Sequence, residues 1–332
     1  MKITRRMAMA AAFAAGAFLA SGPASAQTPK GDGGTIRLMS NPVGTQSYPP
    51  FVIKKFGLDK KYGFNLEVIP FTNPQAAIAA LQSGSIEAVV QDWISLARMR
   101  TQGIEVIGVA PFLSYVNTLL LPADSTIKTL ADLKGKRLGT YTKTGFDWIM
   151  LQAVAKRQYN FDLASEVTLQ EGAPSLLRGS MEQGQLDATL MYNSLTPDMV
   201  LSGKAKLMMT IHDVVAELGL QEAPFLMYAM REEYAEENPG NAKAFVAAYQ
   251  ESIDILLKDP EVWKEQGETL KLAPEATEVF RTNASKEFIK AFTPGMSDVL
   301  NKTFAIVLDT AGPEIMGMSA MPDKVLTLDY QP

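Results

Sequence analysis

Short apolar runs alternate with helix-like segments over roughly the first two thirds of the chain. The runs TIRLMS (35–40), LEVIPF (66–71) and IEAVV (86–90) have the length and apolar character of buried strands. The segment between the last two runs opens with an Asn-Pro pair and closes at a glycine, which are typical signals for the start and the end of a helix. Strands that alternate with helices predict βαβ units and a mostly parallel sheet.

The chain also matches itself at an offset of 100 residues. Five matches fall at the first strand, the second strand, the start and end of the next helix, and the third strand: 37–38 with 137–138, 66–69 with 166–169, Pro74 with Pro174, Gly84 with Gly184, and 86–88 with 186–188. Each match alone is weak, but all five have the same offset, and each joins equivalent positions of the predicted strands and helices. The pattern therefore predicts two lobes with the same local topology.

The last third of the chain has a different pattern. One more strand (225–230) is followed by helix-like segments at 241–258, 260–270, 274–292 and 296–310. A helical tail of this kind cannot form a third sheet, so we expect it to pack back on the first lobe. The chain would then cross between the lobes twice, near 119–125 and 219–226, as a hinged clamp requires.

The expected fold class is α/β, with two lobes that are each a mostly parallel sheet flanked by helices and that are hinged by the two crossings. The expected division of the chain is a signal peptide (1–26), a flexible leader (27–34), the first part of lobe one (35–121), lobe two (122–222) and a mostly helical second part of lobe one (223–332).

The amino terminus predicts export. A cationic head, MKITRR, precedes the apolar run AMAAAFAAGAFLA and the small-x-small site Ala24-Ser25-Ala26, which is the pattern of a cleaved secretory signal peptide. The pair Arg5-Arg6 also fits a twin-arginine signal loosely, so the Sec and Tat routes both remain open. No later stretch has the roughly 18 apolar residues that a membrane helix needs, and we expect a soluble, exported protein.

Composition removes several classes of function. The formal net charge is −5, and loss of the basic signal peptide makes it more negative, which disfavours nucleic acid as a partner. The chain has no cysteine, which excludes thiol catalysis and Cys-ligated metals. His212 is the single histidine, so a metal site built from several histidines is excluded, and no Ser-His-Asp arrangement is apparent.

Ligands of open α/β sheets bind beyond the carboxyl ends of the strands. The loops at those ends in the two lobes would face each other across one cleft. The candidate ligand-binding residues in these loops are, from lobe one, Asn41, Gly44, Thr45, Gln46, Asp92, Trp93 and Phe112, and, from lobe two, Thr142, Lys143, Thr144, Gly145, Phe146, Tyr192 and Asn193.

Several of these candidates also have a purely structural interpretation. Thr144 can cap the following helix, Gly145 can allow a tight turn, and Lys143 can be a solvated loop lysine. Backbone N–H groups at the start of that helix favour an anion. The order Lys-Thr-Gly differs from the Gly-Lys-Ser/Thr of a nucleotide phosphate loop, which excludes that motif.

The remaining candidates leave similar alternatives open. Asp92 can bind an ammonium or hydroxyl group or cap a helix, and Trp93 can stack on a ligand or belong to the core. The two phenylalanines suit packing better than contact. Arg98 and Arg178 lie about a turn into their helices and are expected to be surface charges.

Five segments together resemble the solute-binding proteins of the nitrate/sulfonate/taurine ABC importers, a family that shares its fold with the thiamine-pyrimidine synthases. The segments are PPFVIKKFGLDKKYGFNLEVIPF, AAIAALQSGSIEAVVQDW, IKTLADLKGKRLGTYTKTG, SLLRGSMEQGQLDATLMYN and REEYAEENPGNAKAFVAAYQESIDILLKDPE. The resemblance implies a type II periplasmic-binding-protein fold whose two lobes close on a small solute. It also implies a periplasmic location and docking on a membrane permease. We expect a monomer with no cofactor and no catalytic activity.

Aromatic residues in the predicted cleft favour an organic anion, a sulfonate or carboxylate with an apolar or aromatic body. Its acid group would meet the backbone of 142–146 and its body would meet Trp93. A planar aromatic acid, or a vitamin or quinone cofactor or precursor, is the alternative. An enzyme of the pyrimidine-synthase type, which the resemblance associates with a cysteine-rich motif and donor histidines, and a solute sensor are the alternatives of a different class.

Overall fold

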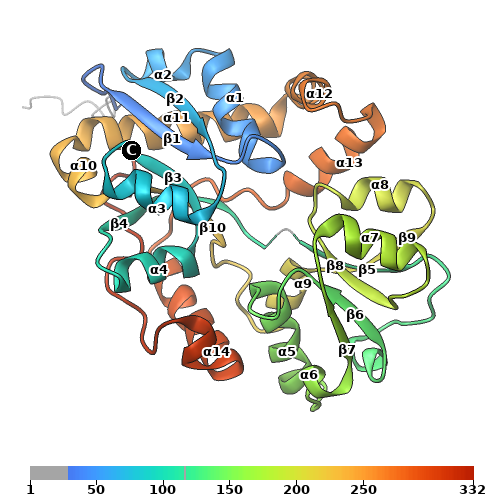
Figure 1. Ribbon diagram of the computed structural model, residues 1–332. Helices are drawn as coiled ribbons and strands as arrows, with labels where there is room; N and C mark the ends of the chain where they lie inside the picture. Colours follow the sequence, from blue (N-terminus) through green and yellow to red (C-terminus); the bar gives the residue numbers. More distant parts are fainter. Residues whose placement is uncertain (1–28, 116) are drawn as a thin grey trace, which may run out of the picture.

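The computed structural model describes residues 29–115 and 117–332. The predicted signal peptide (1–26) and the first residues of the predicted leader lie outside the described residues. Figure 1 shows two lobes, each built on a five-stranded sheet with helices on its faces.

Four strands of the first sheet run in one direction and one strand is reversed. Its order is β2-β1-β3-β10-β4, and β10 runs antiparallel to both of its neighbours. The strands are β1 (Thr35–Ser40), β2 (Asn65–Pro70), β3 (Ala88–Asp92), β4 (Val106–Leu113) and β10 (Leu226–Arg231).

The second sheet repeats this order with its own strands. Its order is β7-β6-β8-β5-β9, and β5 is antiparallel to its neighbours, as β10 is in the first sheet. The strands are β5 (Thr118–Pro122), β6 (Arg137–Thr140), β7 (Thr168–Glu171), β8 (Ala188–Met191) and β9 (Ala205–Thr210). The predicted two-lobed α/β fold is therefore confirmed.

The internal repeat extends to individual side chains. Arg37 pairs with Glu87 in the first sheet, and Arg137 pairs with Asp187 at the same offset in the second. In each pair the arginine backbone N–H also donates to the carboxylate, over 2.7 Å to Glu87 and 2.8 Å to Asp187. The matches at an offset of 100 residues thus reflect one shared structural unit.

The helices follow the expected alternation. Those of the first lobe before the crossing are α1 (Tyr48–Lys55), α2 (Leu58–Lys61), α3 (Pro74–Gln82) and α4 (Trp93–Thr101), with a 3-10 turn η1 (Thr45–Ser47) ahead of α1. Those of the second lobe are η2 (Leu130–Leu133), α5 (Phe146–Gln158), α6 (Leu163–Glu166), α7 (Pro174–Glu182), α8 (Thr196–Leu201) and α9 (Ile211–Ala216).

The tail contains α10 (Glu232–Glu237), α11 (Pro239–Lys258), α12 (Pro260–Thr269), α13 (Pro274–Ala284) and α14 (Met296–Met316). The helix predicted over 274–292 stops at Ala284, because the chain then turns and Phe288 forms a β-bridge with Leu113. The last helix is longer than the predicted 296–310, although Gly312 breaks its regular backbone.

The first crossing lies earlier than predicted. The stretch 119–125 begins inside β5, whose residues Leu119 and Leu120 are buried and pair with β8 and β9. The chain therefore leaves the first sheet after Leu113 and enters the second at Thr118. The return crossing precedes β10, close to the predicted 219–226.

The tail packs on both lobes and not on the first lobe alone. Helix α11 packs against α1, and one core cluster buries Tyr48, Phe245 and Trp263 on that side of the first sheet. Helix α14 instead packs against α5 of the second lobe (Figure 1). A second core cluster, which contains Trp93 and Phe304, accordingly runs between the two sheets.

Candidate functional site

The loop after β1 meets the loop after β8. Asn193 Nδ2 donates to Thr45 Oγ1 over 3.4 Å. Gly44 lies next to Ser194, since a Cβ added to this glycine would be 4.0 Å from the Ser194 Cβ. Within the first loop, the Asn41 backbone N–H donates a hydrogen bond to Gln46 Oε1 over 3.2 Å. The two lobes therefore touch through residues that the sequence predicted for the ligand site.

Asp92 caps a helix. Its carboxylate accepts the Ser95 backbone N–H over 2.8 Å and the Ser95 hydroxyl over 2.7 Å, at the amino terminus of α4. The next residue, Trp93, is fully buried, and its ring meets Phe146 and Phe304 at 6.3 and 6.4 Å between centroids. In the structure, Asp92 caps the helix and Trp93 belongs to the core.

The two predicted phenylalanines lie in different surroundings. Phe112 is fully buried between Tyr228 and Phe288 in the core of the first lobe. Phe146 stacks on Tyr115 at 4.6 Å with nearly parallel rings and also contacts Phe225. Because Tyr115 and Phe225 belong to the two crossings, Phe146 attaches the start of α5 to the hinge.

The loop before α5 differs from its prediction. Thr144 does not cap α5, because the cap residue is Gly145, and the Thr144 hydroxyl contacts that of Thr142 at 3.1 Å. The Thr144 backbone N–H donates to Thr142 Oγ1 over 3.3 Å, and the Gly145 N–H donates to the Thr142 carbonyl over 3.1 Å. Two of the N–H groups expected to face an anion, those of Thr144 and Gly145, are therefore used within the loop.

Lys143 is exposed and has an acidic partner. Its backbone N–H donates to Glu171 over 2.8 Å, and its ammonium group lies 3.3 Å from the same carboxylate. The Lys143 hydrogen bonds lower the pKa of Glu171, so this carboxylate is charged at neutral pH. The predicted anion-binding loop thus already holds a negative side chain.

A buried carboxylate at the start of α5 was missed by the sequence analysis. Asp147 is 8% exposed, and its Oδ2 accepts the side-chain amide of Asn117 over 2.7 Å. Burial raises the pKa of Asp147 to about 6. Its only signal in the sequence is an acidic residue next to the predicted loop and within the apolar run FDWIML, and its partner lies 30 residues earlier.

Two tyrosines of the second lobe stack on each other. Tyr141 and Tyr192 have centroids 4.1 Å apart and rings inclined by 21°. Burial, and after it the charge of Asp147, raises the pKa of both hydroxyls. Tyr192 is 43% exposed, so the pair presents an aromatic surface to solvent.

Comparison with known proteins decides the family. Residues 45–262 match the model of the family described as NMT1/THI5 like. The chain belongs to the NMT1/THI5-like family. Among its relatives is 4-amino-5-hydroxymethyl-2-methylpyrimidine phosphate synthase THI5 of Saccharomyces cerevisiae, at 23% identity over 227 residues, which is 65% of each chain. The chain thus spans about 65% of the length of this curated relative.

Solved structures resemble the whole two-lobed fold. The periplasmic aliphatic sulphonate binding protein SsuA from Escherichia coli superposes with a TM-score of 0.70 at 17% identity, over 87% of this chain and 94% of that chain. The alkanesulfonate-binding protein SsuA from Xanthomonas axonopodis pv. citri, bound to MOPS, gives 0.66 at 18% identity, over 88% and 98%. At such identities the likeness establishes the fold, and it confirms the resemblance inferred from the sequence.

The single histidine of this NMT1/THI5-like chain lies at the hinge. His212 Nδ1 is 3.3 Å from Ser114 Oγ and 3.5 Å from a carboxylate oxygen of Glu287. Both partners face the same ring nitrogen, whereas a hydrolase triad needs one on each nitrogen. The cluster joins a crossing, α9 and the tail, and its geometry does not suit acyl transfer.

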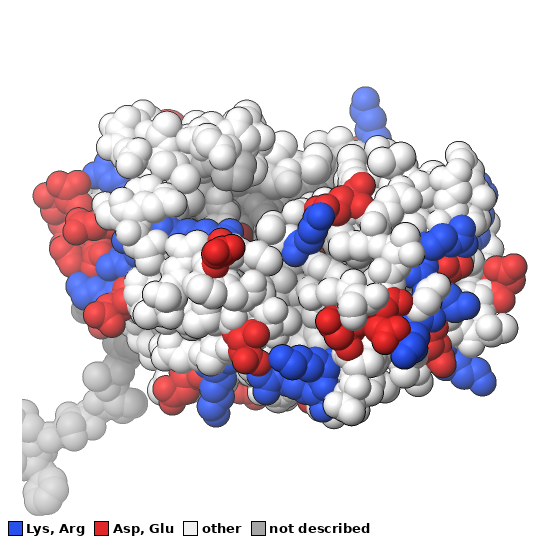
Figure 2. Space-filling model, turned by 60° about the horizontal axis from the view of Figure 1, so that its bottom comes forward, with Lys and Arg blue, Asp and Glu red and all other residues white. Residues whose placement is uncertain are grey.

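The two predicted surface arginines make structural contacts. Arg98 donates to the carbonyl of Met316 over 2.7 Å at the end of α14, and Arg178 pairs with Glu182 at 2.9 Å within α7. On the face shown in Figure 2, acidic and basic side chains are interspersed. No group of metal-binding side chains occurs within 29–115 and 117–332, and none of the helices described there is long and apolar enough to cross a membrane.

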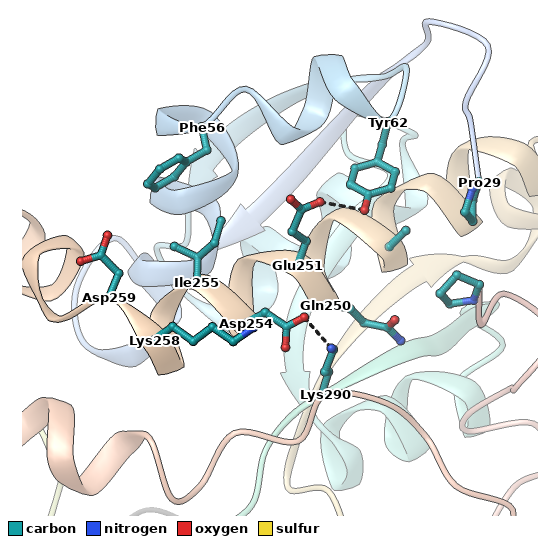
Figure 3. Close-up of a pocket in the computed structure, with 12 residues that line it drawn as sticks. Pro29, Phe56, Tyr62, Gln250, Glu251, Asp254, Ile255, Lys258, Asp259 and Lys290 are labelled. Carbon is teal, nitrogen blue, oxygen red and sulfur yellow. Dashed lines mark hydrogen bonds and ion pairs between the residues drawn. The ribbon is translucent and has the colours of Figure 1, made fainter. Parts of the chain in front are cut away.

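A surface pocket of about 720 Å³ lies along α11 on the first lobe (Figure 3). None of the predicted ligand-binding residues lines it. Its carboxylates already have partners, since Glu251 accepts the Tyr62 hydroxyl over 2.8 Å and Asp254 pairs with Lys290 at 2.6 Å. The pocket is therefore separate from the interlobe residues.

Proposed function

We propose that this protein is an extracytoplasmic solute-binding protein of an ABC importer, which captures a small organic solute between its lobes and delivers it to a membrane permease. The observation that carries the proposal is the contact of Thr45 with Asn193 across the two lobes. The repeated strand order and the fold shared with the SsuA proteins support it. Export to the periplasm and a monomeric state belong to the same proposal.

The lobes would move about the two crossings. Short connections of this kind absorb a rotation while each packed lobe stays rigid. Tyr115 and Phe225 pack at 5.1 Å between centroids and would form the pivot. The division of the chain into 35–121, 122–222 and 223–332 would then follow the moving parts, with the first boundary drawn back to the residues before Thr118.

The proposed solute is a small organic anion, a sulfonate or carboxylate with an apolar or aromatic body. The stacked pair Tyr141–Tyr192 offers the surface for that body. The Thr45 hydroxyl and the Asn193 amide can donate to acid oxygens, whereas the N–H groups of Lys143, Thr144 and Gly145 already have partners within the protein. A planar aromatic acid, or a vitamin or quinone cofactor or precursor, would suit the same surface.

The similarity to the yeast synthases makes an enzyme the second candidate. We favour a role without catalysis, because the chain has no cysteine and one histidine, and that histidine faces Ser114 and Glu287 at the hinge. Formation of a pyrimidine product from a bound vitamin precursor would reverse this view. A solute sensor is distinguished by deleting the gene, since unchanged uptake of the solute would favour the sensor.

Calorimetry over organic sulfonates, carboxylates and aromatic acids tests the proposal directly. We expect at least one compound to bind with a Kd near or below about 1 μM, which corresponds to about −8 kcal/mol. The bound protein should also be more compact in solution than the free protein. Absence of any binder in all three classes would contradict the proposal.

A further inference from the structure

The single histidine of the chain contacts a carboxylate that is attached to the other lobe. His212 lies in α9 of the second lobe, and its Nδ1 is 3.5 Å from a carboxylate oxygen of Glu287. Glu287 is fixed to the end of the first sheet, because its carbonyl accepts the Ser114 backbone N–H over 2.9 Å and the next residue, Phe288, forms a β-bridge with Leu113. The contact therefore joins the two lobes beside the first crossing.

Both groups that face His212 Nδ1 are hydrogen-bond acceptors. The Ser114 hydroxyl donates its one proton to the Glu287 carboxylate, so the Ser114 oxygen, 3.3 Å from Nδ1, offers a lone pair to the ring. Nδ1 therefore carries a proton in this arrangement. A second proton, on Nε2, makes the ring a cation and turns the contact with Glu287 into an ion pair.

This contact is partly shielded from water. The Glu287 side chain is 11% exposed and that of His212 is 34% exposed, so solvent and salt screen the pair less than they would at the surface. Burial raises the pKa of Glu287, whereas the Ser114 hydrogen bond and the charge of His212 lower it. A carboxylate in this position is stabilised more by a cationic ring than by a neutral one.

Other charged groups lie on α9 and on the elements packed against it. Asp213 and Glu217 belong to α9 and its end, and Lys286 precedes Glu287 in the tail. Asp147 begins α5 and Lys206 lies in β9, and both elements contact α9. Burial raises the pKa of Asp147 to about 6, so the titration of this carboxylate has to be separated from that of His212.

We propose that His212 and Glu287 form a pH-dependent latch between the lobes, which holds them together in a mildly acidic medium and weakens as the medium becomes alkaline. The inference rests on the hinge motion of the proposed function and adds its control by pH. Histidine side chains ordinarily titrate near about pH 6.5, so the ion pair is present below that pH and is lost above it. Acid strong enough to protonate Glu287 releases the latch again.

The distance between the lobes, measured with two spin labels, tests the latch. The chain has no cysteine, so labels attach only at Gln102→Cys in the first lobe and Gln185→Cys in the second, and both glutamines are exposed. From pH 8 to pH 6 the ratio of the short to the long interlobe distance should rise about threefold, as expected of a partly exposed ion pair. An unchanged ratio would overturn the inference and leave the capture of a solute, which calorimetry measures separately, standing.

Two variants identify the groups that respond. His212→Gln replaces the ring by a polar side chain that does not titrate, and Glu287→Gln removes the carboxylate. Each should reduce the pH response of the ratio to less than about 1.5-fold. A full response that survives either variant would overturn the inference.

Two further variants are the controls. Asp147→Asn removes the other group that titrates near pH 6 and should keep the full response. Asp162→Asn changes an exposed acid that caps α6 in the same lobe, and it should keep the response as well. Loss of the response in Asp147→Asn would assign it to that carboxylate and overturn the inference.

Discussion

The side-chain amide of Asn193 lies 3.4 Å from the hydroxyl oxygen of Thr45, and this contact joins the loop after β8 of the second sheet to the loop after β1 of the first. The two residues belong to different lobes, so their contact depends on how the lobes are placed relative to each other. The contact therefore marks the surface on which a solute held by both lobes would lie.

Replacement of Asn193 should weaken solute binding without harming the fold. Asn193→Ala removes a donor at the contact between the two lobes, so we expect a loss of affinity of about tenfold, or about 1.4 kcal/mol. The free energy of unfolding of the free protein should change by less than about 0.5 kcal/mol. Calorimetry with the solute and chemical unfolding without it measure the two effects, and an unchanged affinity would exclude Asn193 from the site.

Replacement of Trp93 should mainly destabilise the protein. The sequence predicts that the body of the ligand meets Trp93, but the indole is fully buried against Phe146 and Phe304. We now expect a loss of about 3–5 kcal/mol in the free energy of unfolding. Urea unfolding of Trp93→Ala, with Trp93→Phe as the milder control, checks this value, and a loss below about 1 kcal/mol would return Trp93 to the list of ligand contacts.

Asp147 should make stability depend on pH. Burial raises its folded-state pKa to about 6, above the ordinary 3.8, so the folded protein holds this proton more tightly than the unfolded chain does. The contribution is favourable below about pH 4, is lost as the pH rises through about 6, and amounts to about 3 kcal/mol.

The variant Asp147→Asn isolates that contribution. Thermal unfolding from pH 4 to pH 8 should show the variant similar to the wild type at pH 4 and more stable above pH 6. Lower stability of the variant at pH 7 would mean that the carboxylate has a structural role, and the pH profile of Asp162→Asn serves as the baseline.

The repeated ion pairs offer a comparison between the lobes. The Glu87 side chain is 8% exposed and that of Asp187 is 29% exposed, although both accept from an arginine at the equivalent position. Glu87→Gln should therefore cost about 1–3 kcal/mol of the free energy of unfolding, and Asp187→Asn less than about 1 kcal/mol. Equal costs in urea unfolding would show that burial does not distinguish the two pairs.

Local signals in the sequence were sufficient for the repeated part of the fold. The strands, the Asn-Pro helix start and the cap at Asp92 depend on neighbours within a few residues, and all of them appear in the structure. The helix expected to run to residue 292 ends early because Phe288 pairs with Leu113, a contact between distant segments that no periodicity encodes.

The site was harder to predict for the same reason. Trp93 is buried because α14 returns from the far end of the chain to pack against α5, and Phe304 then covers the indole. Asp147 is buried and accepts a hydrogen bond from Asn117 in the crossing. Neither feature can be read from the residues next to Asp147 in the sequence. Loop positions at strand ends were predictable, but the hydrogen bonds that occupy them were not.

Native mass spectrometry of the protein purified from its natural host tests the central claim most directly. Interlobe solute-binding sites often retain their solute, so we predict a complex heavier than the polypeptide by one small organic molecule, which is released unchanged on denaturation. A mass equal to the bare chain under conditions that preserve the fold, together with no added solute that restores a complex, would contradict the account.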